Sequence, residues 1–361
     1  MIKEKNILVY NVITSNKLGG AELLVNNLSI SLNNYGIESY TIYGNLFHKI
    51  NSSKNQISLN LRNLRSIRFI FRLRKILKKQ KNAKKVKILH LHLTWPLIYG
   101  LIASYGLNYK IIYTEHNTFN KRRNIPLGRF FDYFLYRNCL KIICISNNTK
   151  NALLKWQLNL IDRKKIEVIH NGARKYKFRS RNYHKNKGLN LISIGSLTFQ
   201  KGFDLSINSI PLISDQVDSY IILGEGEMRL KLENLIKKQN LSSKVKLVGL
   251  QENIQPYLDQ ANLAIVPSRW EGFSLATIEM ISAGLPLLIN ENYGGPKEVL
   301  RCKSVLATDL STSIKIANSI RKIKTNLIKN NVNFSEAKSL AKKFSLDNFS
   351  KNYADIYKSI S

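Results

Sequence analysis

Cysteine, long apolar runs and acidic residues are all scarce in this chain, and each shortage narrows the function. The three cysteines, Cys139, Cys144 and Cys302, have no metal-binding or redox spacing, which favours a reduced, cytosolic protein. No apolar run is long enough to cross a bilayer, since the most apolar region, 88–103, is interrupted by polar residues and a proline. The first residues lead into a strand-like stretch without a cleavage site, so no signal peptide is expected.

Acidic residues number only 23 against 57 lysines and arginines, which gives a formal net charge of +34. The excess is concentrated in residues 1–190, where 36 basic and 7 acidic side chains give +29. The remaining residues carry 21 and 16, a net charge of +5. Such a local field implies an anionic partner for the first half: nucleic acid, an anionic membrane surface or a phosphorylated substrate.

The pattern of apolar runs predicts an α/β fold with parallel sheets. Hydrophobic residues make up 44% of the chain, and 361 residues suffice for two domains. Short apolar runs alternate with helical stretches, as in repeated βαβ units. The expected strands are Ile7–Val12, Glu38–Tyr43, Lys87–Leu93, Lys110–Thr114, Lys141–Ile145, Glu167–Ile169, Leu189–Gly195, Ser219–Leu223, Val245–Val248, Leu263–Val266 and Leu287–Asn290.

Two domains of similar size and a final helix are expected. Residues 174–188 are polar and strongly basic, and they are interpreted as a linker. The predicted domains are residues 1–180 and 181–345, each Rossmann-like. Residues 346–361 are expected to form a helix that packs back toward the first domain, with an apolar side that contains Phe349, Tyr353, Ile356 and Tyr357.

A basic amphipathic helix is expected within residues 62–87, which carry twelve lysines and arginines and no acid. Leu61, Leu64, Ile67, Phe71 and Leu77 are assigned to its apolar side. The basic side consists of Arg62, Arg65, Arg68, Arg72, Lys75 and Lys79. Such a helix can lie on an anionic lipid surface. The alternative is a helix packed on the sheet with a solvated basic face.

Four segments carry candidate site residues at strand ends, where open parallel sheets bind ligands. Gly19 and Gly20 begin a helix, whose N-terminus suits a phosphate, although the pattern is not GxGxxG. His116 follows a strand; such a histidine is often structural. Gly195, Ser196 and Lys201 form a loop in which the lysine can neutralise a diphosphate.

The fourth segment runs from a strand end at Val266 to Glu279, with Glu271 in the loop between them. Two carboxylates can act as a glycosidase pair. They can equally accept hydrogen bonds from ribose and hexose hydroxyls. The nearby helix N-terminus offers donors to a phosphate, which favours a nucleotide sugar over simple hydrolysis.

These segments, in this order, resemble the family 4 retaining glycosyltransferases, which have the GT-B fold of two Rossmann-like βαβ domains facing across a cleft. The resemblance covers essentially the whole chain. Its most specific element is the E-x7-E spacing of Glu271 and Glu279. The other matching segments are Gly19-Gly20-Ala21-Glu22, His116, Val168 to Gly172, Gly195 with Lys201-Gly202, and Gly294-Gly295-Pro296-Lys297-Glu298.

The resemblance implies a role for each matched residue. His116, Glu271 and Lys201 would be catalytic: His116 and Glu271 would contact the transferred sugar, and Lys201 would hold the diphosphate. Glu279 would bind the ribose. The remaining donor-binding positions would be Gly19, Gly20, Ser196, Leu250, Gln251, Gly272, Phe273, Ser274 and Leu275, with the backbone near Leu250 and Gln251 reading the base.

One departure from the family pattern concerns the diphosphate. The family usually has an arginine after the glycine of the loop that holds Lys201, and here that residue is Ser196. Stabilisation of the leaving group would then fall on Lys201 and on backbone donors. Arg269, two residues before Glu271, is the candidate substitute. Fixed donors of this kind need no bound metal, so neither a metal nor another cofactor is expected.

The resulting hypothesis is a retaining transferase of the hexosyltransferase class. It would move a hexose or N-acetylhexosamine from a UDP-linked nucleotide sugar to a lipid-linked or surface-polysaccharide acceptor, as in O-antigen, capsule or lipopolysaccharide assembly. The first domain would face the acceptor and the membrane, the second would bind the nucleotide sugar, and the protein would be cytoplasmic, peripheral on the inner face of the membrane.

Three other functions stay open at this point. A nucleotide-sugar epimerase or a phosphorylase could share the fold. A nucleic-acid-binding protein would also explain the basic first half, but the basic segment 62–87 has only Phe69 and Phe71 for base stacking. No nucleic acid is therefore expected as a partner.

Overall fold

The computed structural model describes residues 7–15, 20–46, 55–79, 85–116, 123, 125, 127–181, 183–184, 187–292, 294–329 and 334–361. These residues divide into two compact units. The first contains residues Met1–Gly172 and Leu346–Ser361, and the second contains Ala173–Ser345. The division therefore falls between residues 172 and 173, whereas the sequence placed it between 180 and 181.

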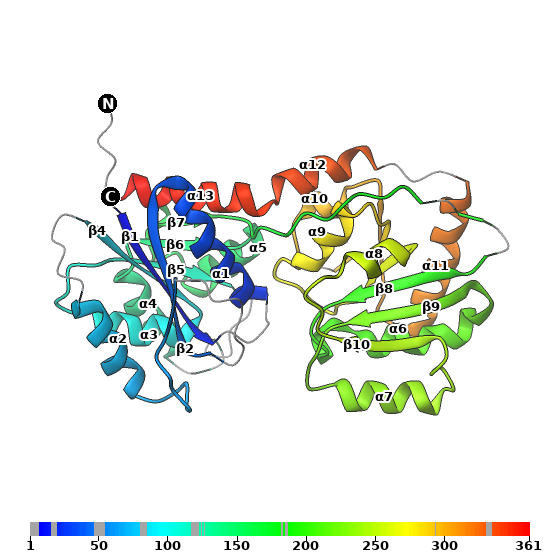
Figure 1. Cartoon of the computed structure of the whole chain (residues 1–361), viewed down its shortest axis with the longest axis horizontal. Helices are drawn as coiled ribbons and strands as arrows, with labels where there is room; N and C mark the ends of the chain where they lie inside the picture. Colours follow the sequence, from blue (N-terminus) through cyan, green and yellow to red (C-terminus); the bar gives the residue numbers. More distant parts are fainter. Residues whose placement is uncertain are drawn as a thin grey trace. The chain divides into compact units, whose positions relative to one another are not determined.

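The first unit is built on a seven-stranded parallel sheet with helices on both faces (Figure 1). In spatial order its strands are β3 (Gln56–Ser58), β2 (Ile37–Asn45), β1 (Ile7–Ser15), β4 (Val86–His92), β5 (Lys110–Glu115), β6 (Lys141–Cys144) and β7 (Ile166–Val168). Its helices are α1 (Gly20–Ser31), α2 (Arg68–Lys79), α3 (Thr94–Ser104), α4 (Gly128–Arg137), α5 (Asn147–Trp156) and α13 (Leu346–Ser359). Because helices cover both faces, central strands such as β1 read as continuous apolar runs.

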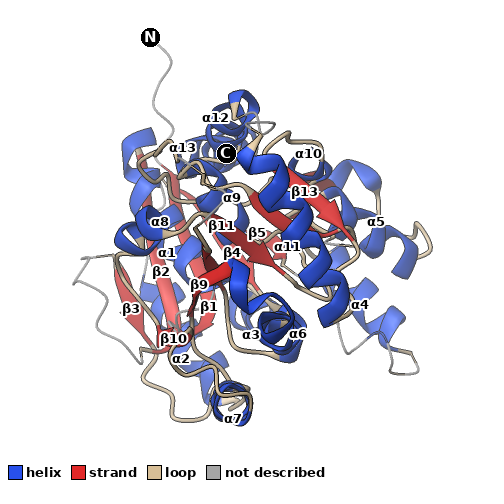
Figure 2. Ribbon diagram, turned by 90° about the vertical axis from the view of Figure 1, so that its right-hand side faces the viewer, coloured by secondary structure: helices blue, strands red, loops and turns tan. Residues whose placement is uncertain are grey.

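The second unit repeats this design on a six-stranded parallel sheet. Its strands, in spatial order, are β10 (Val245–Gly249), β9 (Val217–Leu223), β8 (Leu189–Ile194), β11 (Leu263–Val266), β12 (Leu287–Asn290) and β13 (Val305–Thr308). Its helices are α6 (Phe203–Ser209), α7 (Arg229–Lys238), α8 (Gln255–Gln260), α9 (Leu275–Ser282), α10 (Lys297–Leu300), α11 (Ser313–Ile328) and α12 (Ser335–Lys343). Figure 2 separates the helices and strands by colour.

In each sheet the strand order reverses beside the first strand of the unit, at β1/β4 and at β8/β11. Ligands of open parallel sheets bind at such reversal points, beyond the carboxyl ends of the strands. The loops that follow β8 and β11, and the residues that end β4 and β5, are therefore the positions to inspect for a site.

Helix α13 completes the first unit, although it follows the whole second unit in sequence. The Tyr357 hydroxyl lies 2.6 Å from Nδ1 of His90 in β4, and the Tyr353 hydroxyl lies 3.0 Å from Oγ1 of Thr114 in β5. The Thr114 hydroxyl also contacts Nε2 of His90 at 2.7 Å. All of these side chains are buried, so α13 is joined to the sheet by a hydrogen-bonded polar cluster as well as by apolar packing.

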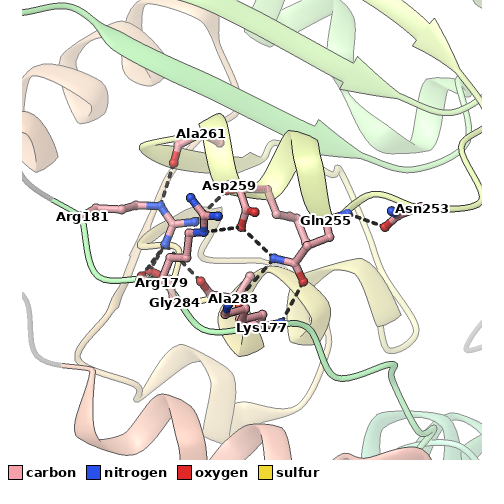
Figure 3. A network of polar contacts seen from close by, with 10 residues as sticks. Lys177, Arg179, Arg181, Asn253, Gln255, Asp259, Ala261, Ala283 and Gly284 are labelled. Atoms are coloured by element: carbon pink, nitrogen blue, oxygen red, sulfur yellow. Dashed lines mark hydrogen bonds and ion pairs between the residues drawn. The ribbon is translucent and has the colours of Figure 1, made fainter.

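Residues 176–181, within the segment interpreted as a linker, are hydrogen-bonded to the rest of the second unit (Figure 3). The Arg181 guanidinium donates to five backbone carbonyls, including that of Leu258 in the last turn of α8, that of Ala261 after α8, and those of Ala283 and Gly284 after α9. Carbonyls at helix ends lack partners within the helix, so one arginine satisfies two helix C-termini. This clamp explains why the division between the units precedes residue 181.

Candidate functional site

The loop after β8 brings Lys201 close to the end of the strand. Residues Phe199–Lys201 form a short 3-10 turn that ends at Gly202, whose φ of 68° is left-handed. A side chain on Gly202 would place its Cβ 2.2 Å from the carbonyl oxygen of Pro267, so only glycine lets this loop meet the loop after β11. The loops after β8 and β11 therefore lie against each other at the strand ends.

Glu271, in the loop after β11, is 5% exposed and held by two neighbours. Its Oε1 accepts a hydrogen bond from Lys201 Nζ at 2.5 Å and another from Ser268 Oγ at 2.8 Å. Within the described residues, Oε2 of Glu271 makes no hydrogen bond. A buried carboxylate with one fixed oxygen and one available oxygen can accept a hydroxyl of a sugar.

Helix α9 begins directly after this loop, at Leu275. Ser274 precedes it with a left-handed φ of 57°, and its side chain gives the helix no N-cap hydrogen bond. The Ser274 hydroxyl instead accepts a hydrogen bond from Thr277 Oγ1 at 2.9 Å. Because the first N–H groups of a helix have no partner within it, the start of α9 offers backbone donors beside Glu271. Gly272 and Phe273 lie in the turn that sets this geometry.

Glu279 lies one turn further along α9. Burial raises the pKa of its carboxyl group to about 7, while the nearby Arg174 charge and a hydrogen bond from the Arg174 backbone act in the opposite direction. Near neutral pH this side chain is therefore divided between the acid, which can donate, and the carboxylate, which accepts from hydroxyl groups.

Arg269, the candidate substitute for the missing diphosphate arginine, is paired with Asp204 of α6. Its Nη1 and Nη2 donate to the two carboxylate oxygens of Asp204 at 3.0 and 2.8 Å, and Nη1 also donates to the Phe199 carbonyl. Its guanidinium carbon lies 3.8 Å from the centre of the Phe199 ring. Arg269 thus holds the loop that carries Lys201. Ser196, in that loop, is exposed, as are Leu250 and Gln251 beyond β10.

In the first unit, His116 follows β5 and joins a buried chain of side chains. Its Nε2 lies 3.2 Å from Nδ1 of His92, whose Nε2 lies 3.3 Å from Oδ1 of Asn11. Burial lowers the pKa of His116 to about 4 and that of His92 well below its usual value. Both imidazoles are therefore neutral at physiological pH. Gly20 is the exposed first residue of α1, and Gly19 lies outside the described residues.

The basic helix is present but shorter and turned differently from the expectation. It starts at Arg68, and its buried residues are Phe69, Leu73 and Leu77. Ile67 and Phe71, assigned to the apolar side, are 65% and 67% exposed. The basic residues Arg62, Arg65, Arg68, Arg72, Lys75 and Lys79 are all exposed, as expected. Periodicity counted from residue 61 gave the wrong phase, because residues 61–67 precede the helix.

An exposed aromatic surface on α4 was not predicted from the sequence. Leu127, Phe130, Phe131 and Phe134 are each about half exposed or more. Contacts join α2 to α3 and α3 to α4, so this surface and the basic helix belong to one helical layer (Figure 1). The signal was available: Phe130, Phe131 and Phe134 recur at helical spacing on a side that no core position requires.

No group of three or more histidine, cysteine or acidic side chains that could hold a metal ion occurs among the described residues. In the same part of the chain, no helix is long and apolar enough to cross a membrane.

Comparison with known proteins gives two adjoining family matches. Residues 18–174 match a family described as Glycosyltransferase Family 4, and residues 175–339 match one described as Glycosyl transferases group 1. The two matches meet at residues 174 and 175, close to the division between the structural units.

Individual proteins resemble the chain over most of its length. An uncharacterized glycosyltransferase of Methanocaldococcus jannaschii is 29% identical over 78% of both chains. An Escherichia coli UDP-Gal:α-D-GlcNAc-diphosphoundecaprenol α-1,3-galactosyltransferase is 28% identical over 65% of this chain and 64% of its own. The solved structure of Anabaena HepE in complex with UDP superposes with a TM-score of 0.78 and 18% identity, covering 98% of this chain and all of the other. The expected pair of Rossmann-like domains of the GT-B fold is confirmed.

Proposed function

Because the chain belongs to the family 4 glycosyltransferases, we propose that it is a retaining hexosyltransferase that uses a UDP-linked hexose or N-acetylhexosamine. The observation that carries this proposal is the Lys201–Glu271 pair beside the start of α9. It combines a cation, a buried carboxylate and helix N–H groups at the point where strand order reverses. This set matches the needs of a sugar diphosphate: donors for the phosphates and an acceptor for hydroxyls.

In this proposal each residue contacts a different part of the nucleotide sugar. Glu279 accepts hydrogen bonds from the ribose, and Glu271 Oε2 accepts one from the transferred sugar. Lys201 and the first N–H groups of α9 hold the diphosphate, together with Gly20 at the start of α1. His116 contacts the donor sugar near its reacting carbon. The backbone at Leu250 and Gln251 contacts the base, and no metal is required.

The proposed reaction is a displacement on one face of the sugar. The acceptor hydroxyl oxygen bonds to the anomeric carbon as the bond from that carbon to the phosphate oxygen breaks. The acceptor proton passes to the departing phosphate oxygen. Negative charge grows on the diphosphate, and fixed donors aimed at that charge supply the largest catalytic contribution. Entry and departure on the same face preserve the anomeric configuration.

We place the acceptor on a lipid diphosphate or a growing envelope glycan, as in O-antigen, capsule or lipopolysaccharide assembly. Two observations support this placement. The first is the activity for which the Escherichia coli relative is named, transfer of galactose to a diphosphoundecaprenol-linked sugar. The second is the excess of basic residues in 1–190, which suits an anionic leaflet and an anionic acceptor. The protein would work at the cytoplasmic face of the membrane.

The activity test supplies the purified chain with UDP-glucose, UDP-galactose or UDP-N-acetylglucosamine and with polyprenyl-diphosphate-linked N-acetylglucosamine. We expect transfer from one donor, with the α-configuration retained in the product by NMR. The Glu271→Gln variant should lose transfer and keep UDP binding. Absence of both transfer and UDP binding would refute the proposal. Sugar interconversion without acceptor would indicate an epimerase, and dependence on inorganic phosphate a phosphorylase.

The membrane test measures co-sedimentation with vesicles of phosphatidylglycerol and phosphatidylcholine. Arg62→Glu with Arg68→Glu should weaken binding, because each basic residue near an anionic surface contributes about 1 kcal/mol. Lys237→Glu with Lys238→Glu, at exposed positions on α7 of the second unit, is the matched control with the same net charge. Arg72 is left unchanged because its guanidinium donates to the Asn60 carbonyl at 2.8 Å. Equal loss in both variants would refute a specific surface.

The aromatic surface of α4 provides a second membrane test. Phe130→Ser with Phe134→Ser should reduce vesicle binding even at high salt, because burial of the two rings in the interface does not depend on charge. Both rings are already exposed, so these substitutions should leave the unfolding transition of the protein nearly unchanged. Binding that is unaffected by them would remove α4 from the membrane surface.

A further inference from the structure

The side chains of Asn11, His92 and His116 form a hydrogen-bonded chain across three neighbouring strands of the first unit. Asn11 lies in β1, His92 ends β4, and His116 follows β5, and these strands are adjacent in the sheet. Each side chain is buried. The chain continues beyond Asn11 to Ser39 in β2 and Ser29 in α1, over distances of 3.0 and 3.1 Å.

The direction of each hydrogen bond follows from its starting point at Asn11. The amide nitrogen of Asn11 donates to Ser39 Oγ, so its carbonyl oxygen faces Nε2 of His92. A carbonyl oxygen can only accept, and therefore Nε2 of His92 carries a hydrogen. Since this imidazole is neutral, its Nδ1 has a lone pair and accepts from Nε2 of His116.

His116 is also neutral and carries its hydrogen on Nε2, so its Nδ1 has a lone pair. We infer that Asn11 and His92 are positioning residues, which hold His116 as a hydrogen-bond acceptor toward a hydroxyl group of the donor sugar. Within the described residues, Nδ1 of His116 has no hydrogen-bond partner. This inference rests on the proposed function for the sugar contact, whereas the tautomers follow from the orientation of the Asn11 amide, whose nitrogen faces Ser39.

The direction of the hydrogen bonds in this chain matters, because the opposite direction also gives every donor an acceptor. If the Asn11 amide were rotated, its nitrogen would donate to His92, and each imidazole would carry its hydrogen on Nδ1. His116 would then offer a hydrogen where the first arrangement offers a lone pair. The first arrangement also places both histidines in the Nε2–H form, which is the more stable tautomer of a free imidazole side chain.

Neutrality of the pair follows from burial and from its neighbours. His90 packs against His92 with ring centres 4.0 Å apart, and its own pKa is held well below the usual value by burial and by His116. The groups facing this cluster from α13 are the phenols of Tyr353 and Tyr357, whose pKa values are raised by burial. A second proton is therefore disfavoured on every ring, and the acceptor state persists across physiological pH.

Long-range proton–nitrogen correlation NMR on protein labelled at histidine nitrogen tests the tautomers directly. We expect His92 and His116 to carry hydrogen on Nε2, with no titration between about pH 5.5 and 8. Assignment comes from the loss of one signal set in His92→Gln or His116→Gln. Protonation of both rings on Nδ1, or a mixture of tautomers, would overturn the inference.

Asn11→Leu, which has a similar shape and no polar group, tests the positioning role. We expect mixed tautomers at His116 and a loss of about threefold to tenfold in affinity for UDP-glucose, UDP-galactose or UDP-N-acetylglucosamine, whichever the wild type binds, as for one neutral hydrogen bond. Affinity for UDP, which lacks the sugar, should not change. Tyr357→Phe, which alters the neighbouring His90 cluster, is the matched control and should keep the wild-type tautomers.

The two readouts separate this inference from the proposed function. Wild-type tautomers in Asn11→Leu, or unchanged affinity for the UDP-sugar, would overturn the positioning role. Equal weakening of UDP and UDP-sugar would also overturn it, because the effect would then be a general loss of structure. Failure of the proposed function would appear differently, as a wild-type protein that binds neither UDP nor any of the three UDP-sugars.

Discussion

The ammonium group of Lys201 lies 2.5 Å from Oε1 of Glu271, and the two side chains come from the loops at the β8/β11 reversal point. Glu271 is buried, so this lysine neutralises a carboxylate that has little access to water. The same ammonium is the proposed partner of the diphosphate. A bound nucleotide sugar would therefore share one cation with Glu271, and the two roles of Lys201 can be separated by mutation.

We predict that Lys201→Met lowers both catalysis and stability. Transfer should fall about a hundredfold, because one donor to the leaving group is removed. The free energy of unfolding should fall by about 3 kcal/mol, because a buried carboxylate loses its cation. Adding Glu271→Gln should restore stability and leave transfer low. Recovery of both properties in the double variant would limit Lys201 to a structural role.

The raised pKa of Glu279 predicts a pH-dependent stability. In the folded state the pKa is about 7, above the ordinary value of 4.5, so the cost of the charged form appears between these values and is complete above pH 7. Glu279→Gln should therefore be more stable than wild type at pH 8, by on the order of 2 kcal/mol, and the difference should vanish below pH 4.5. If urea titrations give the wild type and Glu279→Gln the same pH dependence of the free energy of unfolding, this prediction is contradicted.

The affinity of the wild type for UDP should also depend on the ionisation of Glu279. Here the charged form is the favourable one, whereas it lowers the stability of the fold. The carboxylate accepts hydrogen bonds from ribose hydroxyls more strongly than the protonated group does. Calorimetric titration with UDP is therefore expected to give weaker binding at pH 6 than at pH 8. In Glu279→Gln this pH dependence should disappear and the affinity should be low throughout. A pH dependence that survives the substitution would assign it to another group.

Arg181 should be the most sensitive basic residue between residues 173 and 188. Arg181→Lys keeps the charge but cannot reach five carbonyls at once, so the free energy of unfolding should fall by about 2–4 kcal/mol. Arg179→Lys is the control, since Arg179 is exposed and its ion pair with Asp259 should contribute less than about 1 kcal/mol. Equal effects in denaturant titrations would contradict the clamp.

Removal of the Tyr357 hydroxyl tests the attachment of α13. Tyr357→Phe leaves Nδ1 of the buried His90 without its partner, which should cost about 1–3 kcal/mol. Tyr133→Phe, on α4 of the same unit, is the control because its ring is only partly buried. We expect hydrogen exchange in β4 and β5 to accelerate in Tyr357→Phe alone. Unchanged exchange would show that apolar packing suffices to hold the helix.

The sequence was sufficient for features that depend on local pattern. The two parallel sheets followed from apolar runs that alternate with helices, and the Lys201 and Glu271 loops followed from glycines and charges at strand ends. Those signals lie within a few residues of one another, and the strand ends bring them together whatever the details of packing. The family matches support the same interpretation for residues 18–339.

Features that depend on distant partners were not predictable in this way. Arg269 was a reasonable substitute for the missing arginine until Asp204, 65 residues earlier, proved to be its partner. The Asn11–His92–His116 chain requires the strand order β1-β4-β5, which no single segment encodes. Phe71 was misassigned because the position at which α2 begins, and hence its buried side, is set by packing of Phe69 and Leu73 on the sheet.

The attachment of α13 has a consequence for biosynthesis. Its residues close the polar cluster around His90, yet they leave the ribosome only after the entire second unit, Ala173–Ser345, has been made. At typical rates of synthesis that interval lasts roughly 10 to 30 seconds. During it His90 in β4 and Thr114 in β5 lack their tyrosine partners, so the nascent first unit must wait, incompletely folded, while the second completes its own core. Chaperone dependence should therefore be greatest for residues made first.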